Sequence, residues 1–265
     1  AIGSAEGVLR ICKICDVPAV IAVRRDATLA GSLINALIAA GQEDDFIDPK
    51  GALPIISQRT LCIVVDTYQL GLVESREILE KCGKVAVIDH HRKGVGFIEK
   101  ADLVCHEPYA SSASELVTEF LQYVGDRDDK PNRIEAEGLL SGIMLDTRDF
   151  TLHTGVRTFE AAAALRRYGA ETEHVRQLFD VSMVEYTTKA RLVSEAQMYR
   201  GCAITVSGEV APEARVAIAQ AANDLLTIQN VEASFVAVQV GTGVNISARS
   251  LGAVNVQVIM ESLGG

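Results

Sequence analysis

The stretch VAVIDHHR, residues 85–92, decides the fold of this 265-residue sequence. Its first five residues form a continuous apolar run that ends in an acid. The runs AVIAV at residues 19–23 and LCIVVD at residues 61–66 have a similar length and character. Apolar runs without alternation are typical of strands that are buried on both faces, as in a parallel sheet covered by helices. We therefore expect a parallel sheet built around these three runs.

Helical patterns lie before, between and after these runs. They cover residues 5–15, 28–40, 75–82, 113–124, 134–145 and 157–167. Ser112 and Glu115 fit a capping box that begins the fourth of these helices. Strands that alternate with helices predict an α/β domain, a parallel sheet flanked by helices, over residues 1–180.

The pattern changes in the last third of the chain. Residues 181–197 are polar and helical, and we expect them to form a connector helix. Strands are expected at residues 202–206, 234–240 and 244–249, and helices at residues 212–226 and 253–263. Gly241-Thr242-Gly243 separates two of the strands at hairpin spacing. These elements predict a second, smaller α/β domain over residues 198–265.

Acidic residues end three of the apolar runs in the first domain, at Asp66, Asp89 and Asp146. At the carboxyl ends of strands in such sheets, an Asp projects into the ligand crevice. A single Asp in this position is more often a turn former, but three of them in one domain favour a functional site.

His90 and His91 directly follow the strand that ends in Asp89. Imidazole and carboxylate groups together suit manganese, iron or zinc, whereas sites made only of carboxylates suit magnesium. Two partly exposed loop histidines without a ligand fit the spacing equally well, so both interpretations stay open here.

The other three histidines lack such a pattern. His106 and His174 have no evident partners, and we expect them to be structural or exposed. His153 follows Asp146 by seven residues and either lies outside the crevice, which we favour, or faces into it.

The strand expected at residues 244–249 alternates polar with apolar residues. Asn245, Ser247 and Arg249 share one face, because successive side chains of a strand point to opposite sides. An amide, a hydroxyl and a guanidinium suit phosphate binding, since Arg is well shaped for bidentate phosphate contact. The solvent-facing side of an ordinary strand would show the same pattern.

Composition limits the class of partner. The formal net charge of −10 argues against a long nucleic-acid duplex, which requires a basic face. Hydrophobic residues make up 48% and charged residues 23%, as in a folded soluble protein. The six cysteines lie mostly in apolar runs, which is typical of reduced residues in a cytoplasmic protein. The sequence has no apolar run of about 18 residues, the length that a membrane-spanning helix needs.

Together these residues resemble the DHH phosphoesterase family, which is named for the Asp-His-His motif found here at residues 89–91. Asp66 and Asp146 match the second and fourth motifs of that family. Residues 243–250 (GVNISARS) resemble the substrate-binding signature of its DHH-associated domain. The resemblance covers essentially the whole chain.

The resemblance implies a site for two manganese ions. Asp66 would bridge both ions, and His90 and Asp146 would complete one of them. Asp89 would support the cluster, and His91 would contact the scissile phosphate, which a hydroxide would attack in line.

The resemblance also implies the substrate and the setting. Asn245, Ser247 and Arg249 would hold the nucleotide across a cleft between the domains, and the reaction would open cyclic-di-AMP to linear pApA. The stretches PYASS at residues 108–112 and TGVRTFE at residues 154–160 are similar to the membrane-bound bacterial cyclic-di-AMP phosphodiesterases of the family. Their DHH module follows regulatory domains, so this chain would be a cytoplasmic module of a membrane-anchored bacterial protein. A homodimer is compatible with that resemblance.

The sequence departs from the family at both ends. The first family motif, His-x-x-x-Asp-x-Asp, precedes a helix that begins Ala-Ile-Gly-Ser, and Ala1-Ile2-Gly3-Ser4 matches only that helix start. At the other end, the family continues beyond the position of Gly265 into a glycine-rich loop with a substrate-binding histidine. For residues 1–265 alone we therefore expect weak metal binding, little or no hydrolysis, and exposed apolar sheet edges.

Three other functions are weighed against this one. A nanoRNase, which hydrolyses short oligonucleotides, has the same architecture. A sensor that binds cyclic dinucleotide without turnover would fit the incomplete first motif. A family-two inorganic pyrophosphatase shares the DHH motif but has a different second domain, so the face formed by Asn245, Ser247 and Arg249 disfavours it.

Overall fold

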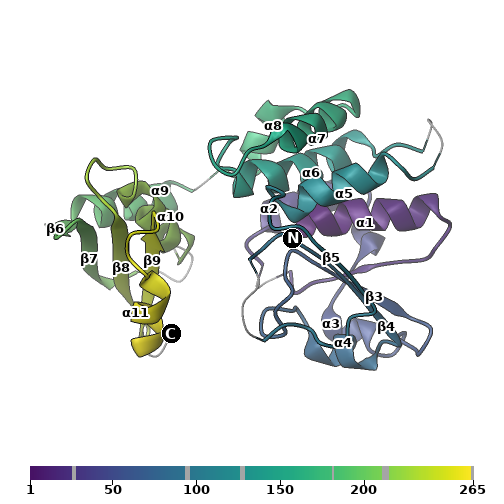
Figure 1. The fold of residues 1–265 in the computed structure, drawn as a ribbon, viewed down its shortest axis with the longest axis horizontal. Helices are drawn as coiled ribbons and strands as arrows, with labels where there is room; N and C mark the ends of the chain where they lie inside the picture. The colour runs from purple at the N-terminus through teal and green to yellow at the C-terminus, as the bar shows by residue number, and fades with distance from the viewer. Residues whose placement is uncertain (26–27, 93–95, 126–128, 181, 211–214, 264–265) are drawn as a thin grey trace. The chain divides into compact units, whose positions relative to one another are not determined.

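The computed structural model describes residues 1–25, 28–92, 96–125, 129–180, 182–210 and 215–263. The chain divides into two compact units, Ala1–Phe179 and Asp180–Gly265, and Figure 1 colours them along the chain from purple to yellow. Among the helices of these described residues, none is long and apolar enough to cross a membrane.

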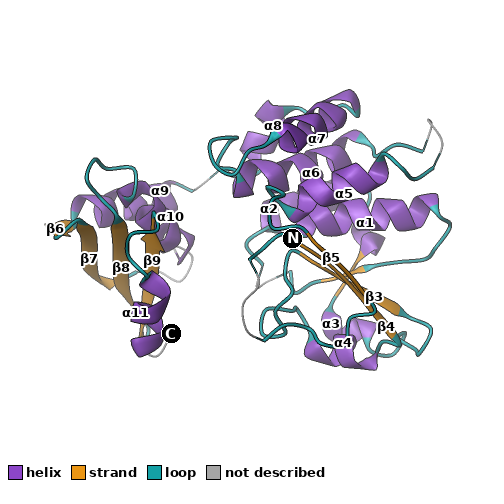
Figure 2. Ribbon diagram, viewed as in Figure 1, coloured by secondary structure: helices purple, strands orange, loops and turns teal. Residues whose placement is uncertain are grey.

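Parallel strands form the centre of the first unit (Figure 2). β1 (Ile21–Ala22) pairs with β2 (Phe46–Ile47), and β4 (Lys84–Asp89) lies between β3 (Leu61–Val65) and β5 (Leu103–His106). The parallel pairing is confirmed, and the three apolar runs overlap β1, β3 and β4, but the expectation of one sheet around all three was wrong because β1 pairs with β2 in a separate sheet. Sequence analysis missed β2 and β5, because each is short and β5 begins with two exposed residues.

Eight α-helices are described in the first unit. They are α1 (Ile2–Ile14), α2 (Gly31–Ala39), α3 (Pro49–Ala52), α4 (Arg76–Lys81), α5 (Ala113–Leu121), α6 (Arg133–Asp146), α7 (Val156–Arg167) and α8 (Thr172–Gln177), with a short 3-10 helix, η1, at Glu43–Asp45. Each of the six predicted helical regions contains a helix. The short helices α3 and α8 were not predicted. The α/β class inferred from the sequence is therefore confirmed for this unit.

Helices α1 and α6 pack with their main chains almost in contact. A Cβ atom added to Gly3 would lie 2.0 Å from the carbonyl oxygen of Gly138, so α1 cannot carry a side chain at this point. Leu139 and Ile143 of α6 then join Ile88 of β4 in the main buried core. This packing brings the end of α6 to the carboxyl end of β4.

The start of α5 corrects part of the predicted capping box. Ser112 is the N-cap, and its hydroxyl accepts a hydrogen bond from the Glu115 amide at 3.0 Å, as predicted. The Glu115 carboxylate, however, accepts from the amide and hydroxyl of Ser111 rather than from the Ser112 amide. The reciprocal half of the capping box was therefore wrong, because a neighbouring hydroxyl supplies a second donor to the buried carboxylate.

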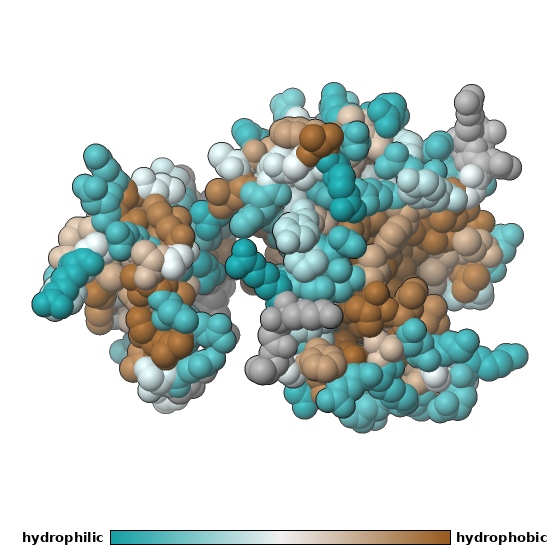
Figure 3. Space-filling view, viewed as in Figure 1, coloured by the Kyte–Doolittle hydropathy of each residue, from teal (hydrophilic) through white to brown (hydrophobic). Residues whose placement is uncertain are grey.

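The strands of the first unit form two separate sheets, β1–β2 and β3–β4–β5, within the described residues. β3 pairs only with β4 there, and β1 only with β2. Leu61, Leu103 and Val104 on the outer strands are at least half exposed. Figure 3 shows apolar surface, drawn in brown, in the area of these strands.

A four-stranded sheet forms the second unit, in the order β6 (Gln197–Tyr199), β7 (Cys202–Glu209), β8 (Ala233–Val240) and β9 (Gly243–Ser250). β7 and β8 are parallel, and the other two pairs are antiparallel. The predicted hairpin is present, with Val240 opposite Gly243. The helices are α9 (Met183–Ser194), α10 (Arg215–Leu225) and α11 (Val256–Ser262). Leu192 of α9 lies in the core beneath α10, so α9 contributes to the packing of this unit.

Candidate metal centre

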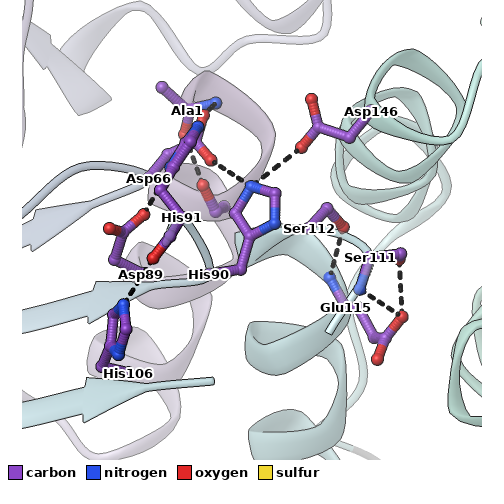
Figure 4. A network of polar contacts seen from close by, with 11 residues as sticks. Ala1, Asp66, Asp89, His90, His91, His106, Ser111, Ser112, Glu115 and Asp146 are labelled. Atoms are coloured by element: carbon purple, nitrogen blue, oxygen red, sulfur yellow. Dashed lines mark hydrogen bonds and ion pairs between the residues drawn. The ribbon is translucent and has the colours of Figure 1, made fainter. Parts of the chain in front are cut away.

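Three elements of the first unit deliver polar side chains to one place (Figure 4). Asp66 follows β3, and its left-handed backbone (φ 65°) is held by a hydrogen bond from its amide to the Ile88 carbonyl. Asp89 is the last residue of β4, and His90 and His91 come next. Asp146 is the last residue of α6, so it ends the helix expected over residues 134–145, and treating its apolar run as a strand end was wrong. A helix end here takes the position that sequence analysis gave to a third strand end.

The His90 imidazole lies between two carboxylates. Its Nε2 atom is 3.4 Å from Asp66 Oδ1 and 3.4 Å from Asp146 Oδ2. Nε2 is buried and has no hydrogen-bond partner among the described residues, which is costly for a polar atom. Two ligand atoms bound about 2.1 Å from one ion would lie about 3 to 3.5 Å apart, so each of these two pairs has the spacing of ligands to one ion. Ligand atoms of Asp66, His90 and His91 all lie within 4.8 Å of one another, and Asp146 is absent from this group.

The amino terminus lies at the same place. The Ala1 ammonium is 2.7 Å from Asp66 Oδ2, the oxygen that does not face His90. Asp66 therefore presents one oxygen to the imidazole and the other to a positive charge. Residues before Ala1 in a longer chain would extend from this point.

The two carboxylates beside His90 have opposite pKa shifts. Burial alone would raise the pKa of Asp66, but the nearby His90 imidazole and the hydrogen bond from the terminal ammonium lower it to about 2. Burial, followed by repulsion from Asp66, raises the pKa of Asp146 to about 6. Two carboxylates that disfavour each other's charge are characteristic of a site that binds a cation, because the cation relieves the repulsion.

Asp89 faces away from His90 and binds the second histidine. It is fully buried, and its Oδ1 is 2.7 Å from His91 Nδ1. Although burial opposes its charge, the hydrogen bond from His91 lowers the pKa of Asp89, and the same bond raises the pKa of His91. The side chain of His91 is 55% exposed, so a half-buried imidazole with cationic character lies at the surface of the site.

Two residues that sequence analysis did not select also contact this segment. His106 Nε2 lies against the His91 carbonyl, and the Tyr68 hydroxyl donates to the Arg92 carbonyl at 2.6 Å. The His106 contact depends on the register of β5, and the Tyr68 contact on the path of the chain after β3, neither of which a local pattern indicated. His174 pairs with buried Glu137 at 3.1 Å, as a structural residue does. His153 is exposed and does not appear in the group around His90.

The predicted polar face of the second unit is present on β9. Antiparallel partners share a face, and Ser247 and Arg249 lie opposite Val236 and Ser234 of β8. The Ser234 hydroxyl donates to a carbonyl of α10, so this is the face that the helix packs against. Asn245 is exposed, whereas Ser247 and Arg249 are half-buried at the edge of the sheet. The exposed Val244 shows that the apolar side of β9 is the side away from the core.

Known proteins match this chain along its whole length. The chain is 45% identical over 270 residues to the cyclic-di-AMP phosphodiesterase GdpP of Geobacillus thermodenitrificans and 40% identical over 269 residues to the cyclic-di-AMP phosphodiesterase PdeA of Listeria monocytogenes. Both alignments cover 100% of this chain and 41% of the relative, so the chain spans less than half the length of these relatives.

The fold has a close counterpart among solved structures, an exopolyphosphatase-related protein from Bacteroides fragilis. The two share 19% sequence identity with a TM-score of 0.78, over 95% of this chain and 76% of that one. Residues 1–143 match the DHH family, N-terminal domain, which is more than half of the 265 residues. The chain therefore belongs to the DHH family.

Proposed function

We propose that this chain is the hydrolytic module of a manganese-dependent phosphodiesterase that opens cyclic-di-AMP to linear pApA. The observation that carries the proposal is the buried, unpartnered Nε2 of His90 between Asp66 and Asp146. Similarity to the cyclic-di-AMP phosphodiesterases of Geobacillus and Listeria supports the choice of substrate.

Asp66, His90 and Asp146 would hold manganese through two carboxylates and one imidazole, a donor set that suits this metal. When bound, the ion would stabilise negative charge on the phosphate and lower the pKa of water. Oδ1 of Asp66 faces His90, so Oδ2, which lies against the positive charge of Ala1, would be the oxygen that binds a second ion. The remaining ligands of that ion would come from residues before Ala1, where the His-x-x-x-Asp-x-Asp motif is expected.

His91 would contact the scissile phosphate. Its imidazole is half exposed, and Asp89 favours its protonated, cationic form. A cation at this position would attract the phosphate and stabilise the charge that develops on it during attack. Asp89 would keep the ring in place and would not itself reach the ion.

The second unit would hold the nucleotide through Asn245, Ser247 and Arg249. Arg249 donates to the main-chain carbonyl of Ala248 at 2.8 Å, and its side chain makes no ion pair within the described part of the chain. Its guanidinium is therefore available for a phosphate group. In the longer parent protein, this module would lie in the cytoplasm beside regulatory and membrane domains.

The test uses a chain extended upstream through the expected first motif and its strand. With Mn²⁺ present, we expect this chain to convert cyclic-di-AMP to pApA, and chromatography would measure the product. The His91→Ala variant should lose this conversion. His90→Ala should weaken Mn²⁺ binding, measured by calorimetry, while the exposed His153→Ala should leave it unchanged.

Three other outcomes would overturn the proposal. Binding of cyclic-di-AMP without turnover would favour a sensor. Turnover of short RNA or pApA, with cyclic-di-AMP left intact, would favour a nanoRNase. Full hydrolysis in the His91→Ala variant would remove His91 from the site.

A further inference from the structure

The segment that leaves the Asp-His-His motif is held by its main chain at two consecutive carbonyl groups. His106 Nε2 contacts the His91 carbonyl oxygen, and the Tyr68 hydroxyl donates to the Arg92 carbonyl oxygen at 2.6 Å. A carbonyl oxygen only accepts, so the proton of the His106 imidazole must lie on Nε2. Two side-chain donors thus bind adjacent peptide groups.

One donor comes from the segment after β3 and the other from β5, the two strands on either side of β4. Tyr68 follows Asp66 by two residues at the end of β3, and its main chain is itself bonded to Ile98. His106 ends β5 and lies directly opposite Asp89 in the parallel register. The ends of all three strands are therefore connected through this segment.

The donors also support each other. Their rings are 5.7 Å apart and meet edge to face at 82°. Tyr68 is 6% exposed, so its ring cannot move away without opening the core around Leu79 and Val85. An edge-to-face pair of this kind restricts both rings.

His91 has few other restraints. More than half of its side chain is exposed, and among the described residues its imidazole is hydrogen-bonded to Asp89. The direction of its Cα–Cβ bond is set by the two peptide groups that flank it. The His91 carbonyl belongs to one of these flanking groups and the Arg92 carbonyl to the peptide group after it, so holding both restricts where the imidazole begins.

We infer that Tyr68 and His106 are positioning residues, which hold His91 in the direction that phosphate contact requires. The catalytic meaning of this inference rests on the proposed role of His91. That Tyr68 and His106 hold the main chain beside His91 concerns only residues of this chain, and it applies in the absence of metal and substrate.

The test follows the shared Nδ1 proton of His91 by NMR in the metal-free 265-residue chain. The sequence contains five histidines, and His91→Ala assigns the resonance. His106→Phe keeps a ring against Tyr68 but has no donor, whereas His106→Gln restores an amide donor. Tyr68→Phe removes only the hydroxyl. Tyr123→Phe is the matched control, because Tyr123 is 89% exposed.

We expect exchange of this proton with water to become about tenfold faster in His106→Phe and in Tyr68→Phe, as loss of one hydrogen bond predicts. His106→Gln and Tyr123→Phe should exchange at the rate of the parent chain. In the upstream-extended enzyme, both donorless variants should lower kcat and leave KM unchanged. Unaltered exchange in both donorless variants, or no rescue by His106→Gln, would overturn the inference. Absence of hydrolysis in the extended parent enzyme would overturn only the proposed function.

Discussion

Glu6 is a buried acid with too few hydrogen-bond donors around it. The side-chain amide of Gln42 donates to Glu6 at 3.0 Å and to Glu135 at 3.1 Å. The second carboxyl oxygen of Glu6 is buried and has no partner in the described part of the chain. Burial, followed by repulsion from Glu135 and Asp45, raises the pKa of Glu6 from 4.5 to about 7. The folded protein therefore favours the neutral carboxyl group.

This shift predicts a loss of stability with rising pH. Between pH 4.5 and about 7 the unfolded chain loses the Glu6 proton while the folded chain keeps it, so the free energy of unfolding falls as pH rises. The full shift corresponds to on the order of 3 kcal/mol above pH 7. Glu6→Gln should remove this dependence and raise stability at pH 8, with little change at pH 4.5. Urea unfolding at pH 4.5 and at pH 8 measures the free energy of unfolding of the variant and the parent chain.

A control for this prediction is Glu80→Gln, because Glu80 lies exposed on α4. In this variant, the free energy of unfolding should change between pH 4.5 and pH 8 by the same amount as in the parent chain. If Glu6→Gln and Glu80→Gln change stability at pH 8 by the same amount, burial of Glu6 is not the cause.

At the level of elements, the turn after α6 fixes the direction of Asp146. Three consecutive residues, Arg148, Asp149 and Phe150, have left-handed backbones with φ of 47°, 54° and 63°. None is glycine, and each such residue costs about 1–3 kcal/mol unless its surroundings hold it. The fully buried Thr147 supplies these restraints. Its hydroxyl donates to the Ile143 carbonyl at 2.7 Å and accepts from the Phe150 amide at 2.9 Å.

Removing the hydroxyl of Thr147 should release this turn. Thr147→Val keeps the shape of the side chain but leaves the Phe150 amide without an acceptor, at a cost of about 1–3 kcal/mol. Thr147→Ser keeps the hydroxyl and should cost less. Chemical denaturation measures both, and hydrogen exchange of the Phe150 amide should speed up in the Val variant alone. Equal exchange in the two variants would contradict the role of the hydroxyl.

The contact of α1 with α6 gives a second prediction for an element. Gly3→Ala would place a methyl group 2.0 Å from a main-chain oxygen, so the helices must separate, at a cost of about 1–3 kcal/mol. This movement would also draw Ala1 away from Asp66. Gly31→Ala is the matched change, because its Cβ meets no atom within 4 Å and alanine favours a helix. Thermal unfolding should show a lower Tm for Gly3→Ala and an equal or higher Tm for Gly31→Ala.

Sequence patterns predicted the elements better than their junctions. Continuous apolar runs identified β3 and β4 because both strands carry the apolar residues of a covered sheet. β5 was not predicted, because Leu103 and Val104 are exposed and the apolar run is short. Asp89, His90 and His91 were predictable as a group because they are adjacent in the sequence. The position of Asp146 was not, because it depends on how far α6 runs before Thr147 ends it.

On the scale of the whole chain, the apolar cores follow the division into two units. The core around Leu139 and Ile143 lies entirely in Ala1–Phe179. The core around Leu225 and Val236 lies entirely in Asp180–Gly265. A buried residue of one core therefore makes its apolar contacts within its own unit. Distant sites that share no partners contribute to stability independently.

Truncation of one core residue should therefore weaken one unit and leave the other unchanged. Leu225 and Leu139 are both fully buried helical leucines, so Leu225→Ala and Leu139→Ala form a matched pair. Each change should cost about 2–5 kcal/mol. Hydrogen exchange read by mass spectrometry should show faster exchange in β7 and β8 for Leu225→Ala, and in α5 and α6 for Leu139→Ala. Faster exchange in both units from either change would mean that the two units unfold together, and the metal centre would then depend on the packing of the second unit.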